Sequence, residues 1–218
     1  MIEKFKGAYL IDDSLATKNL VPGKRVYGER LVQDGGIEYR LWNPNRSKLA
    51  AAIFNGLKEL PLSESSKVLY LGAASGTTAS HVSDIALQGL VFCVDFSPRV
   101  FVKLLEVCSL RKNMIPIFAD ASQPEQYSSL VEKCDVIYQD IAQPNQVEIL
   151  VANAERYLKP HGSIIIAIKA RSIDVSKKPK EIFDAEIQKL KKFFRVSDVV
   201  YLEPYEKDHV LVVGEILE

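Results

Sequence analysis

The sequence has no excess charge of either sign, and this limits how it can act on nucleic acids. Its 28 basic side chains are balanced by 28 acidic ones. Proteins that hold nucleic acid mainly through their own phosphate contacts are usually distinctly basic, because counterion release supplies much of their affinity. If the substrate is a nucleic acid, we therefore expect other molecules to help deliver it.

The sequence also has few cysteines and no long apolar run. The three cysteines, Cys93, Cys108 and Cys134, are scattered among apolar residues, which predicts reduced core thiols rather than a disulfide framework or a zinc site. No apolar run approaches the roughly 20 residues that span a bilayer, and the first residues do not have the pattern of a signal peptide. We therefore expect an intracellular, cytoplasmic protein with no bound metal ion and no membrane contact.

From residue 67 onward, strand-like and helix-like patterns alternate. A chain of 218 residues is long enough for one well-buried α/β domain. Its short apolar, β-branched runs are typical of strands covered on both faces. These runs are 67–72, 90–96, 114–120, 134–141, 163–170, 196–204 and 209–217. The alternation predicts a mainly parallel sheet with right-handed crossovers.

Three amphipathic stretches between these runs are expected to be helices with one buried face. Apolar residues recur at helical spacing in each of them. The predicted buried stripes are Phe101, Leu104, Leu105 and Cys108; then Val147, Leu150, Val151, Ala154 and Leu158; then Ile182, Phe183, Ile187, Leu190 and Phe194, with Phe193 also in the core.

The end of the chain departs from the alternation. Residues 205–208 alone separate the sixth run from the seventh. A parallel crossover needs a dozen or more residues, so the last two strands are expected to be antiparallel neighbours. A seven-stranded Rossmann-like sheet with an antiparallel last strand resembles that of class I methyltransferases.

The first 45 residues have a different pattern. The alternating stretches 8–12, 24–33 and 37–44 are separated by the turn signals Pro-Gly and Asp-Gly-Gly. We interpret residues 1–45 as a small antiparallel β region packed on a main domain, residues 46–218. Tyr39, Leu41 and Trp42 are expected to pack against that domain, and a docking surface for a partner is the alternative.

A glycine-rich turn, LGAASGTT, joins the first run to the next helix. Its spacing is Gly-x-x-x-Gly (Gly72, Gly76), not the Gly-x-Gly-x-x-Gly of dinucleotide-binding proteins, and it lacks the lysine of a P-loop. Helix N-termini attract anions. The turn therefore favours a small carboxylate over a triphosphate, with the Thr77 and Thr78 hydroxyls as donors.

The next two strand ends carry acidic residues. Asp95 lies 23 residues after Gly72, about the distance at which a carboxylate holds a ribose diol in such folds. Phe96 offers a ring to an adenine face, and Asp120 with the Ala121 N–H offers an acceptor and a donor to its edge. A ribose, an adenine and a carboxylate together describe S-adenosylmethionine (AdoMet).

Three ionisable residues are expected at the same edge of the sheet. Asp140 ends the fourth run, Lys169 ends the fifth, and His209 begins the reversed seventh. In open parallel sheets, ligands bind outside the carboxyl ends of the strands. Lys48 is a fourth candidate, near the start of a helix whose entry we place at Pro44 and Asn45. The pattern alone leaves simpler interpretations open, with Lys48 and Lys169 as solvated lysines, Asp140 as a helix cap and His209 as a structural histidine.

Several segments of the chain together resemble fibrillarin, the RNA 2′-O-methyltransferase of box C/D ribonucleoproteins. They are WNPNRSKLAAAI, LGAASGTTASHVSD, VDFSPR, YQDIAQPNQ, YLKPHG, IKARSID and EKDHVLVVG, from about Val26 to the C-terminus. The resemblance implies a catalytic set of Lys48, Asp140, Lys169 and His209. It implies AdoMet as cofactor, held by Gly72, Ala73, Ala74, Gly76, Thr77, Thr78, Asp95, Phe96, Asp120, Ala121, Asp140 and Gln143.

The resemblance also implies an assembly. Fibrillarins work with a Nop-domain scaffold protein, a kink-turn-binding ribosomal-type protein and a box C/D guide RNA that pairs with target rRNA or tRNA. The Gly/Arg-rich N-terminal tail of eukaryotic members is absent, so the sequence is similar to the archaeal form. Two residues depart from the family pattern, namely Asp95 in place of a more usual glutamate and Pro98 in place of a frequent histidine.

The sequence therefore predicts an AdoMet-dependent RNA ribose 2′-O-methyltransferase. A ribose hydroxyl holds its proton tightly, so its methylation requires positioning and relief of that proton. We expect Asp140 and Lys169 to have the central roles, supported by Lys48 and His209. Two alternatives stay open, a stand-alone methyltransferase of a small molecule or protein and a catalytically idle AdoMet-binding subunit. A secondary idea is an RNA path along Arg171, Lys177, Lys178 and Lys180.

Overall fold

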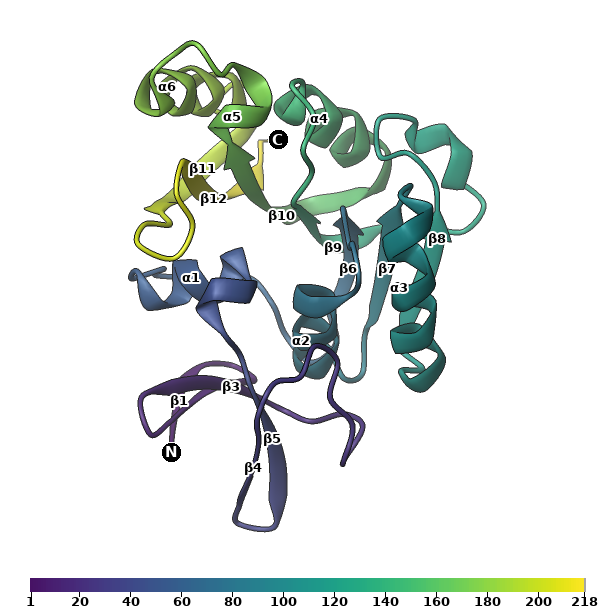
Figure 1. Ribbon diagram of the computed structural model, residues 1–218. Coiled ribbons are helices and arrows are strands. Elements are labelled where there is room, and N and C mark those ends of the chain that lie inside the picture. The colour runs from purple at the N-terminus through teal and green to yellow at the C-terminus, as the bar shows by residue number, and fades with distance from the viewer. Residues whose placement is uncertain (218) are drawn as a thin grey trace.

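The computed structural model describes residues 1–217, which form two β-sheets with helices on both faces of the larger one (Figure 1). The larger sheet is seven-stranded, with the order β11-β12-β10-β9-β6-β7-β8. Its strands are β6 (Lys67–Leu71), β7 (Leu90–Asp95), β8 (Met114–Phe118), β9 (Cys134–Gln139), β10 (Leu158–Lys169), β11 (Phe194–Tyr201) and β12 (His209–Ile216).

Strand β12 runs antiparallel to both of its neighbours, β10 and β11. Strands β6 to β10 pair with one another in parallel. This arrangement confirms the predicted parallel sheet with a reversed last strand. The start of β12 therefore lies at the same edge of the sheet as the carboxyl end of β10, because Lys169 pairs with His209.

Helices cover both faces of this sheet and bury two apolar cores. The α-helices are α1 (Lys48–Phe54), α2 (Thr77–Ile85), α3 (Pro98–Leu110), α4 (Gln146–Tyr157), α5 (Ala170–Ile173) and α6 (Pro179–Leu190), with 3-10 turns at Pro44–Arg46 and Pro124–Tyr127. Residues of α1, α2 and α3 share one core with the sheet, and residues of α4 and α6 share the other. In the described residues 1–217, no helix is both long and apolar enough to cross a membrane.

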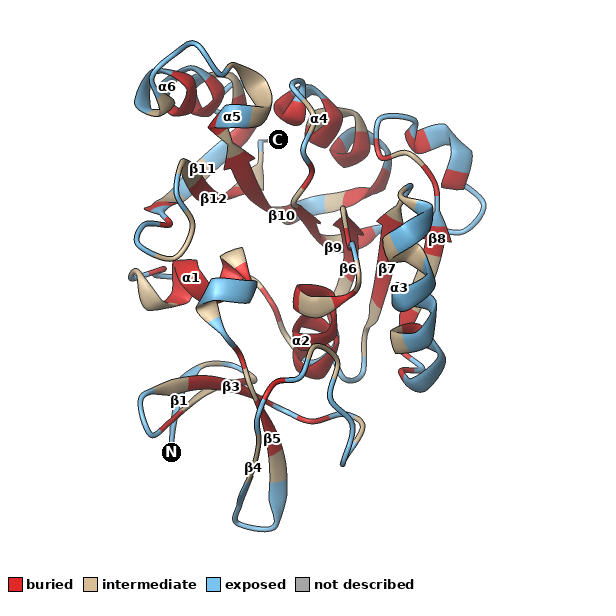
Figure 2. Cartoon of the chain, in the orientation of Figure 1, coloured by how far each residue is buried: buried red, intermediate tan, exposed pale blue. Residues whose placement is uncertain are grey.

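The predicted helix stripes are buried or, at Phe101 and Val151, partly buried, with two exceptions. Leu105 is 45% exposed on α3, whose outer side is largely pale blue in Figure 2, and Phe193 is 43% exposed beyond α6. Phe194 is buried but begins β11, and Leu158 is buried but begins β10, so neither continues a helix. Helical spacing cannot show where a helix ends, and the chain turns into strands at these points. Cys93, Cys108 and Cys134 are free and buried, as expected.

The N-terminal residues form a second, antiparallel sheet with the order β1-β2-β3-β5-β4. Its strands are β1 (Ile2–Phe5), β2 (Ala8–Ile11), β3 (Ser14–Lys18), β4 (Leu31–Asp34) and β5 (Ile37–Leu41). Strands β1 and β3 were not predicted, and residues 24–30 lie in a loop although they were assigned to an alternating stretch. The Glu29 carboxylate accepts the N–H groups of Val26 and Tyr27, which closes that loop. The division of the chain after residue 45 stays a prediction.

A buried charge network joins the small sheet to α2. The Arg40 side chain on β5 lies 2.6 Å from the Glu29 carboxylate and 2.8 Å from that of Asp84, and Arg111 lies 2.6 Å from Asp84. All four side chains are at most 2% exposed. Such a network leaves no buried charge uncompensated, and therefore fixes the small sheet on the larger domain.

Of the three residues near position 40 that were expected to pack on the main domain, only Trp42 does so. Its ring stacks on that of His81 in α2, with ring centroids 4.8 Å apart, and is 1% exposed. Tyr39 and Leu41 instead belong to a separate cluster within the small sheet. His81 accordingly has a structural role, since it also contacts Thr17 and Tyr27.

Candidate active site

The glycine-rich turn packs directly on the turn that follows β9. Gly72 has φ +83°, and a Cβ atom there would lie 2.3 Å from the carbonyl oxygen of Asp140. Two backbones can approach this closely only where one has no side chain. Gly72 therefore brings the cofactor-type turn and Asp140 together.

The tip of the same turn is tied to β7. Ala74 has φ +48°, an unfavourable conformation for a residue with a side chain. Its N–H donates to Asp95 Oδ2 at 2.8 Å, and Asp95 Oδ1 accepts the N–H of Ser97 at 2.9 Å. The Asp95 carboxylate thus links the glycine-rich turn to the end of β7.

A cavity of about 270 Å³ lies between these strand ends. Eight residues expected at the cofactor or the reaction centre contribute to its wall: Gly72, Ala74, Asp95, Phe96, Ala121, Asp140, Gln143 and Lys169. Phe96 is 54% exposed at its mouth. Among residues 1–217, no group of three or more histidine, cysteine, aspartate or glutamate side chains is arranged to hold a metal ion.

Five other residues expected at the cofactor, Ala73, Gly76, Thr77, Thr78 and Asp120, do not line this cavity. Asp120 Oδ1 accepts the N–H of Ser122 at 2.9 Å and lies 3.4 Å from the amide nitrogen of Gln143, which does line the cavity. Thr78 is buried, and its hydroxyl donates to Ser47 Oγ at 3.0 Å. The Thr78 side chain therefore faces the inside of the protein, because α2 packs that side on α1.

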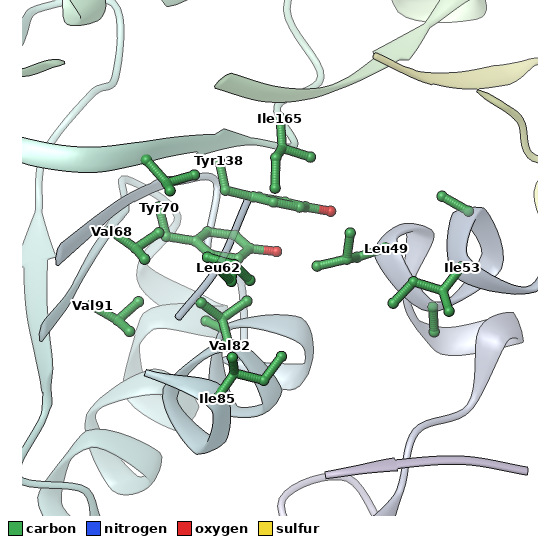
Figure 3. Packing of buried hydrophobic residues seen from close by; sticks show 14 of the residues in the cluster. Leu49, Ile53, Leu62, Val68, Tyr70, Val82, Ile85, Val91, Tyr138 and Ile165 are labelled. Atoms are coloured by element: carbon green, nitrogen blue, oxygen red, sulfur yellow. The ribbon is translucent and has the colours of Figure 1, made fainter. Parts of the chain in front are cut away.

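The helix that carries Lys48 begins later than predicted. Pro44 and Asn45 lie in a 3-10 turn, and α1 starts at Lys48 itself. Ser47 caps α1 by accepting the N–H of Ala50 and is also the acceptor for Thr78. The stacked rings of Tyr70 and Tyr138 point toward Leu49, also on α1 (Figure 3). Ser47 was overlooked because its neighbours come from distant parts of the chain.

Lys48, Asp140 and Lys169 meet at the edge of the sheet. The Lys48 Nζ atom lies 3.2 Å from Asp140 Oδ2, and the Lys169 Nζ atom lies 3.0 Å from Asp140 Oδ1. All three side chains are between 14% and 19% exposed. Burial alone would raise the pKa of Asp140, but the two ammonium groups outweigh it and hold that pKa below its usual range. Asp140 is therefore an ionised carboxylate between two cations.

The backbone of Lys169 is held from both sides. Lys169 pairs with His209 across β10 and β12. On its other side, the Gln146 side chain accepts the Lys169 N–H at 3.0 Å and donates to the Lys169 carbonyl at 3.2 Å. Gln146 is fully buried at the start of α4. The sequence pattern does not reveal this role, although Gln146 ends the fibrillarin-like segment YQDIAQPNQ.

One ring nitrogen of His209 is bonded to the backbone. Its Nδ1 atom lies 2.6 Å from the carbonyl oxygen of Lys207, so Nδ1 carries a proton and donates it there. In the neutral imidazole, Nε2 is then the acceptor. Burial, followed by the charges of Lys48 and Lys169, lowers the pKa of His209. The structure thus brings all four predicted ionisable residues to one edge.

The loop expected after Lys169 carries exposed basic residues, although Arg171 lies in the short helix α5 and Lys180 in α6. Arg171 pairs with Asp208 and Lys177 with Asp174. Lys178 and Lys180 are exposed. An RNA path along this loop stays a prediction.

Comparison with known proteins identifies the family. The sequence profile of fibrillarin matches residues 1–218. A fibrillarin-like rRNA/tRNA 2′-O-methyltransferase from Methanopyrus kandleri is 56% identical over 220 residues, 98% of this chain and 95% of the relative. The structure of Aeropyrum pernix fibrillarin with natively bound S-adenosyl-L-methionine has a TM-score of 0.90 and 48% identity, and covers 97% of this chain and 95% of that one.

A solved fibrillarin/Nop5p complex contains a chain with a TM-score of 0.91 and 47% identity, covering 97% of this chain and 98% of that one. Together with the seven-stranded sheet and its reversed β12, these matches confirm the predicted class I methyltransferase fold. The chain belongs to the fibrillarin family.

Proposed function

We propose that this protein is an AdoMet-dependent RNA ribose 2′-O-methyltransferase, the catalytic subunit of a box C/D guide-RNA ribonucleoprotein that modifies rRNA or tRNA. The observation that carries the proposal is the ionised Asp140 held between Lys48 and Lys169, beside the cavity at the strand ends. The M. kandleri relative, which carries the corresponding name, supports it.

The residues around the cavity fit AdoMet. Asp95 offers carboxylate lone pairs to ribose hydroxyls, Phe96 a ring to the adenine, and the turn from Gly72 to Ala74 a backbone free of large side chains. Asp120, which lies outside the cavity wall, positions Gln143 within it. When bound, AdoMet supplies a methyl group on a positively charged sulfur.

The two lysines stabilise the oxygen that attacks. As the ribose 2′-hydroxyl loses its proton, negative charge develops on the oxygen, and fixed ammonium groups nearby lower the energy of that state. Asp140 stays ionised and lies within ion-pair distance of both ammonium groups, so it orients both lysines. Holding the hydroxyl in place contributes more to the rate than proton transfer alone, for which a factor of about 10²–10⁴ is typical.

His209 accepts the proton in this proposal. Its Nδ1 proton is fixed by the Lys207 carbonyl, which leaves Nε2 as the basic atom. Its lowered pKa keeps the ring neutral at pH 7, as a proton acceptor must be. Asp140 is less suited to this role, because two ammonium groups reduce its basicity.

The partners follow from the same assignment. A Nop-domain protein serves as scaffold, as the fibrillarin/Nop5p complex of a relative supports. A kink-turn-binding protein and a box C/D guide RNA complete the proposed assembly, with base pairing selecting the nucleotide. The balanced charge of this chain agrees with that division of roles. A cytoplasmic location stays a prediction.

Methyl transfer to a guide-matched RNA tests the proposal. The chain, the scaffold protein, the kink-turn protein and guide RNA are mixed with labelled AdoMet and a target whose 2′-hydroxyl is either present or replaced by hydrogen. We expect label only in the hydroxyl-bearing target and only with the partners present. Label in the deoxy target would place the methyl group elsewhere. Turnover without the partners would favour a stand-alone enzyme. The absence of label from both targets would favour a catalytically idle subunit.

A further inference from the structure

Lys48 is held differently from the other three candidate catalytic residues. Asp140, Lys169 and His209 lie at or just beyond the ends of strands in the large sheet, whereas Lys48 is the first residue of α1, a helix of seven residues. A helix this short is barely stable in water by itself. The position of the Lys48 ammonium group therefore depends on how the start of α1 is fixed.

The charge of Lys48 does not favour the start of a helix. The N-terminus of a helix carries a partial positive charge, so a lysine in the first turn is unfavourable there. The first turn of α1, all of which the structure describes, contains no acidic side chain that would offset this. The ion pair of Lys48 is instead with Asp140, on a different element. Other groups must therefore hold the start of the helix.

Ser47, the residue immediately before Lys48, is one of these groups. Its Oγ atom accepts the N–H of Ala50 at 3.3 Å, and its carbonyl oxygen accepts the N–H of Ala51 at 2.9 Å. A serine at this position satisfies N–H groups that the start of a helix otherwise leaves without a partner. Ser47 is buried. It thus fixes the backbone from which the Lys48 side chain projects.

A second helix holds Ser47 in turn. Thr78, the second residue of α2, is buried and donates its hydroxyl to Ser47 Oγ at 3.0 Å. Its side chain also contacts the phenol of Tyr70, which stacks on Tyr138, and both phenols point toward α1 (Figure 3). Helix α2 begins directly after the glycine-rich turn. The bond between the two hydroxyl groups therefore ties the start of α1 to the element that follows that turn.

We propose that Ser47 and Thr78 are positioning residues for the reaction. The bond between their hydroxyl groups fixes the start of α1, and thereby holds the Lys48 ammonium group opposite Asp140. The Thr78 hydroxyl, which was expected to bind the cofactor, acts through Lys48 in this assignment. The part that Lys48 takes in methylation rests on the proposed function. Its placement by Ser47 and Thr78 does not, and so it can be measured in the chain by itself.

Acetylation of the Lys48 amine tests this placement. The full chain is treated briefly with N-acetoxysuccinimide, and mass spectrometry of its peptides compares Lys48 with the exposed Lys103. In the wild type, Lys48 is largely buried and paired with Asp140, so it should react slowly. Thr78→Val, which removes the hydroxyl but keeps the shape, should raise the acetylation of Lys48 several-fold, and Ser47→Ala should do the same. Thr78→Ser keeps the hydroxyl and should react as slowly as the wild type. An unchanged rate in both Thr78→Val and Ser47→Ala would overturn the proposal.

The rate of methylation connects this placement with the reaction. In the assembled complex with AdoMet and target RNA saturating, Thr78→Val should lower the single-turnover rate by about tenfold, whereas Thr78→Ser should keep it. The dissociation constant for AdoMet, measured by calorimetry, should change by less than about twofold, because the proposed bond does not involve the cofactor. A weakening of AdoMet binding as large as the loss in rate would assign the Thr78 hydroxyl to the cofactor site, and so overturn the proposal.

Thr17 provides a matched control. Its buried hydroxyl also joins α2 to another element, since it donates to Asp84 Oδ2 at 2.8 Å from strand β3 of the small sheet. Thr17→Val should lower the melting temperature but leave both the acetylation of Lys48 and the methylation rate as in the wild type. Equal effects of Thr17→Val and Thr78→Val would overturn the proposal, because any loosening of α2 would then be sufficient. If the wild-type complex transfers no methyl group, the proposed function fails, and the acetylation result still decides the placement of Lys48.

Discussion

Lys169 and His209 face each other as paired residues of the antiparallel strands β10 and β12. Side chains of paired residues lie on the same face of a sheet, about 5 Å apart at their Cβ atoms. A parallel last strand would place residue 209 at the opposite edge. The reversal of β12 is therefore what brings an imidazole to the two lysines and the carboxylate.

The pH dependence of methylation should reflect the lowered pKa of His209. A depressed pKa keeps the imidazole neutral as the pH falls to the ordinary histidine value of 6.5 and somewhat beyond. We therefore expect kcat/KM to fall only below pH 6.5, where this ring becomes protonated. His209→Gln should lower the rate and remove that acidic limb. A limb centred above this value, or one that persists in His209→Gln, would assign the proton acceptor to another group.

Substitution of Gly72 should be far more harmful than substitution of Gly76. Both have a positive φ, +83° and +85°, so an alanine is strained at either position. At Gly72 the new Cβ would also lie 2.3 Å from the Asp140 carbonyl, whereas at Gly76 the nearest atom is the flexible Leu104 Cδ1 at 3.2 Å. In urea unfolding, Gly72→Ala should lose about 1–3 kcal/mol more of the free energy of unfolding than Gly76→Ala. The Gly72→Ala variant should also bind AdoMet more weakly. Equal losses in the two variants would mean that the glycine-rich turn and the turn after β9 can move apart without cost.

Removal of Arg40 should destabilise the protein severely. Its side chain is 0% exposed between Glu29 and Asp84, so Arg40→Ala leaves buried carboxylates without their cation. We expect a loss of about 3–5 kcal/mol in the free energy of unfolding. The exposed pair of Arg195 with Glu215 is the control, and Arg195→Ala should cost at most about 1 kcal/mol. Similar unfolding curves for both variants would contradict the proposed structural role of the network.

Gln146 should affect the rate of catalysis as well as stability, because its amide fixes both backbone groups of Lys169. Gln146→Leu keeps the volume and removes both bonds, so we expect kcat to fall by about tenfold, equivalent to about 1.4 kcal/mol. Asn113, also buried, bonds the Ser83 and Ala86 carbonyls away from the site. Asn113→Leu should lower the melting temperature but leave kcat unchanged. Parallel effects of the two variants on kcat would show that Gln146 acts through stability alone.

The arrangement of Asp140, Lys169 and His209 could be predicted because strand ends are fixed by topology, whereas Lys48 lies on α1 and its place in the set followed from the resemblance to fibrillarin. Once the runs ending near Asp140 and Lys169 are strands of one parallel sheet, their ends share an edge. The short connection before His209 then forces the reversal. This prediction needs only the direction of each strand, so it holds even where the predicted strand boundaries are wrong by several residues.

Other features depend on contacts between distant parts of the chain, which spacing does not reveal. Gln146 and Ser47 act through bonds to Lys169 and Thr78, in elements far away in sequence. Leu105 fits the helical stripe, but the face of α3 that packs on the sheet is too narrow to cover it. Strands β1 and β3 are short and lack a clear alternation, and pairing within the small sheet defines them.

The most direct test of the account is the single-turnover rate of Lys169→Ala in the assembled complex, with AdoMet and target RNA both saturating. Arg171→Ala, which removes a nearby exposed cation, is the control. We predict that Lys169→Ala lowers the rate of ribose methylation by about 10²–10⁴ while Arg171→Ala keeps it. An unchanged rate in Lys169→Ala would contradict the claim that the groups around Asp140 carry out the reaction.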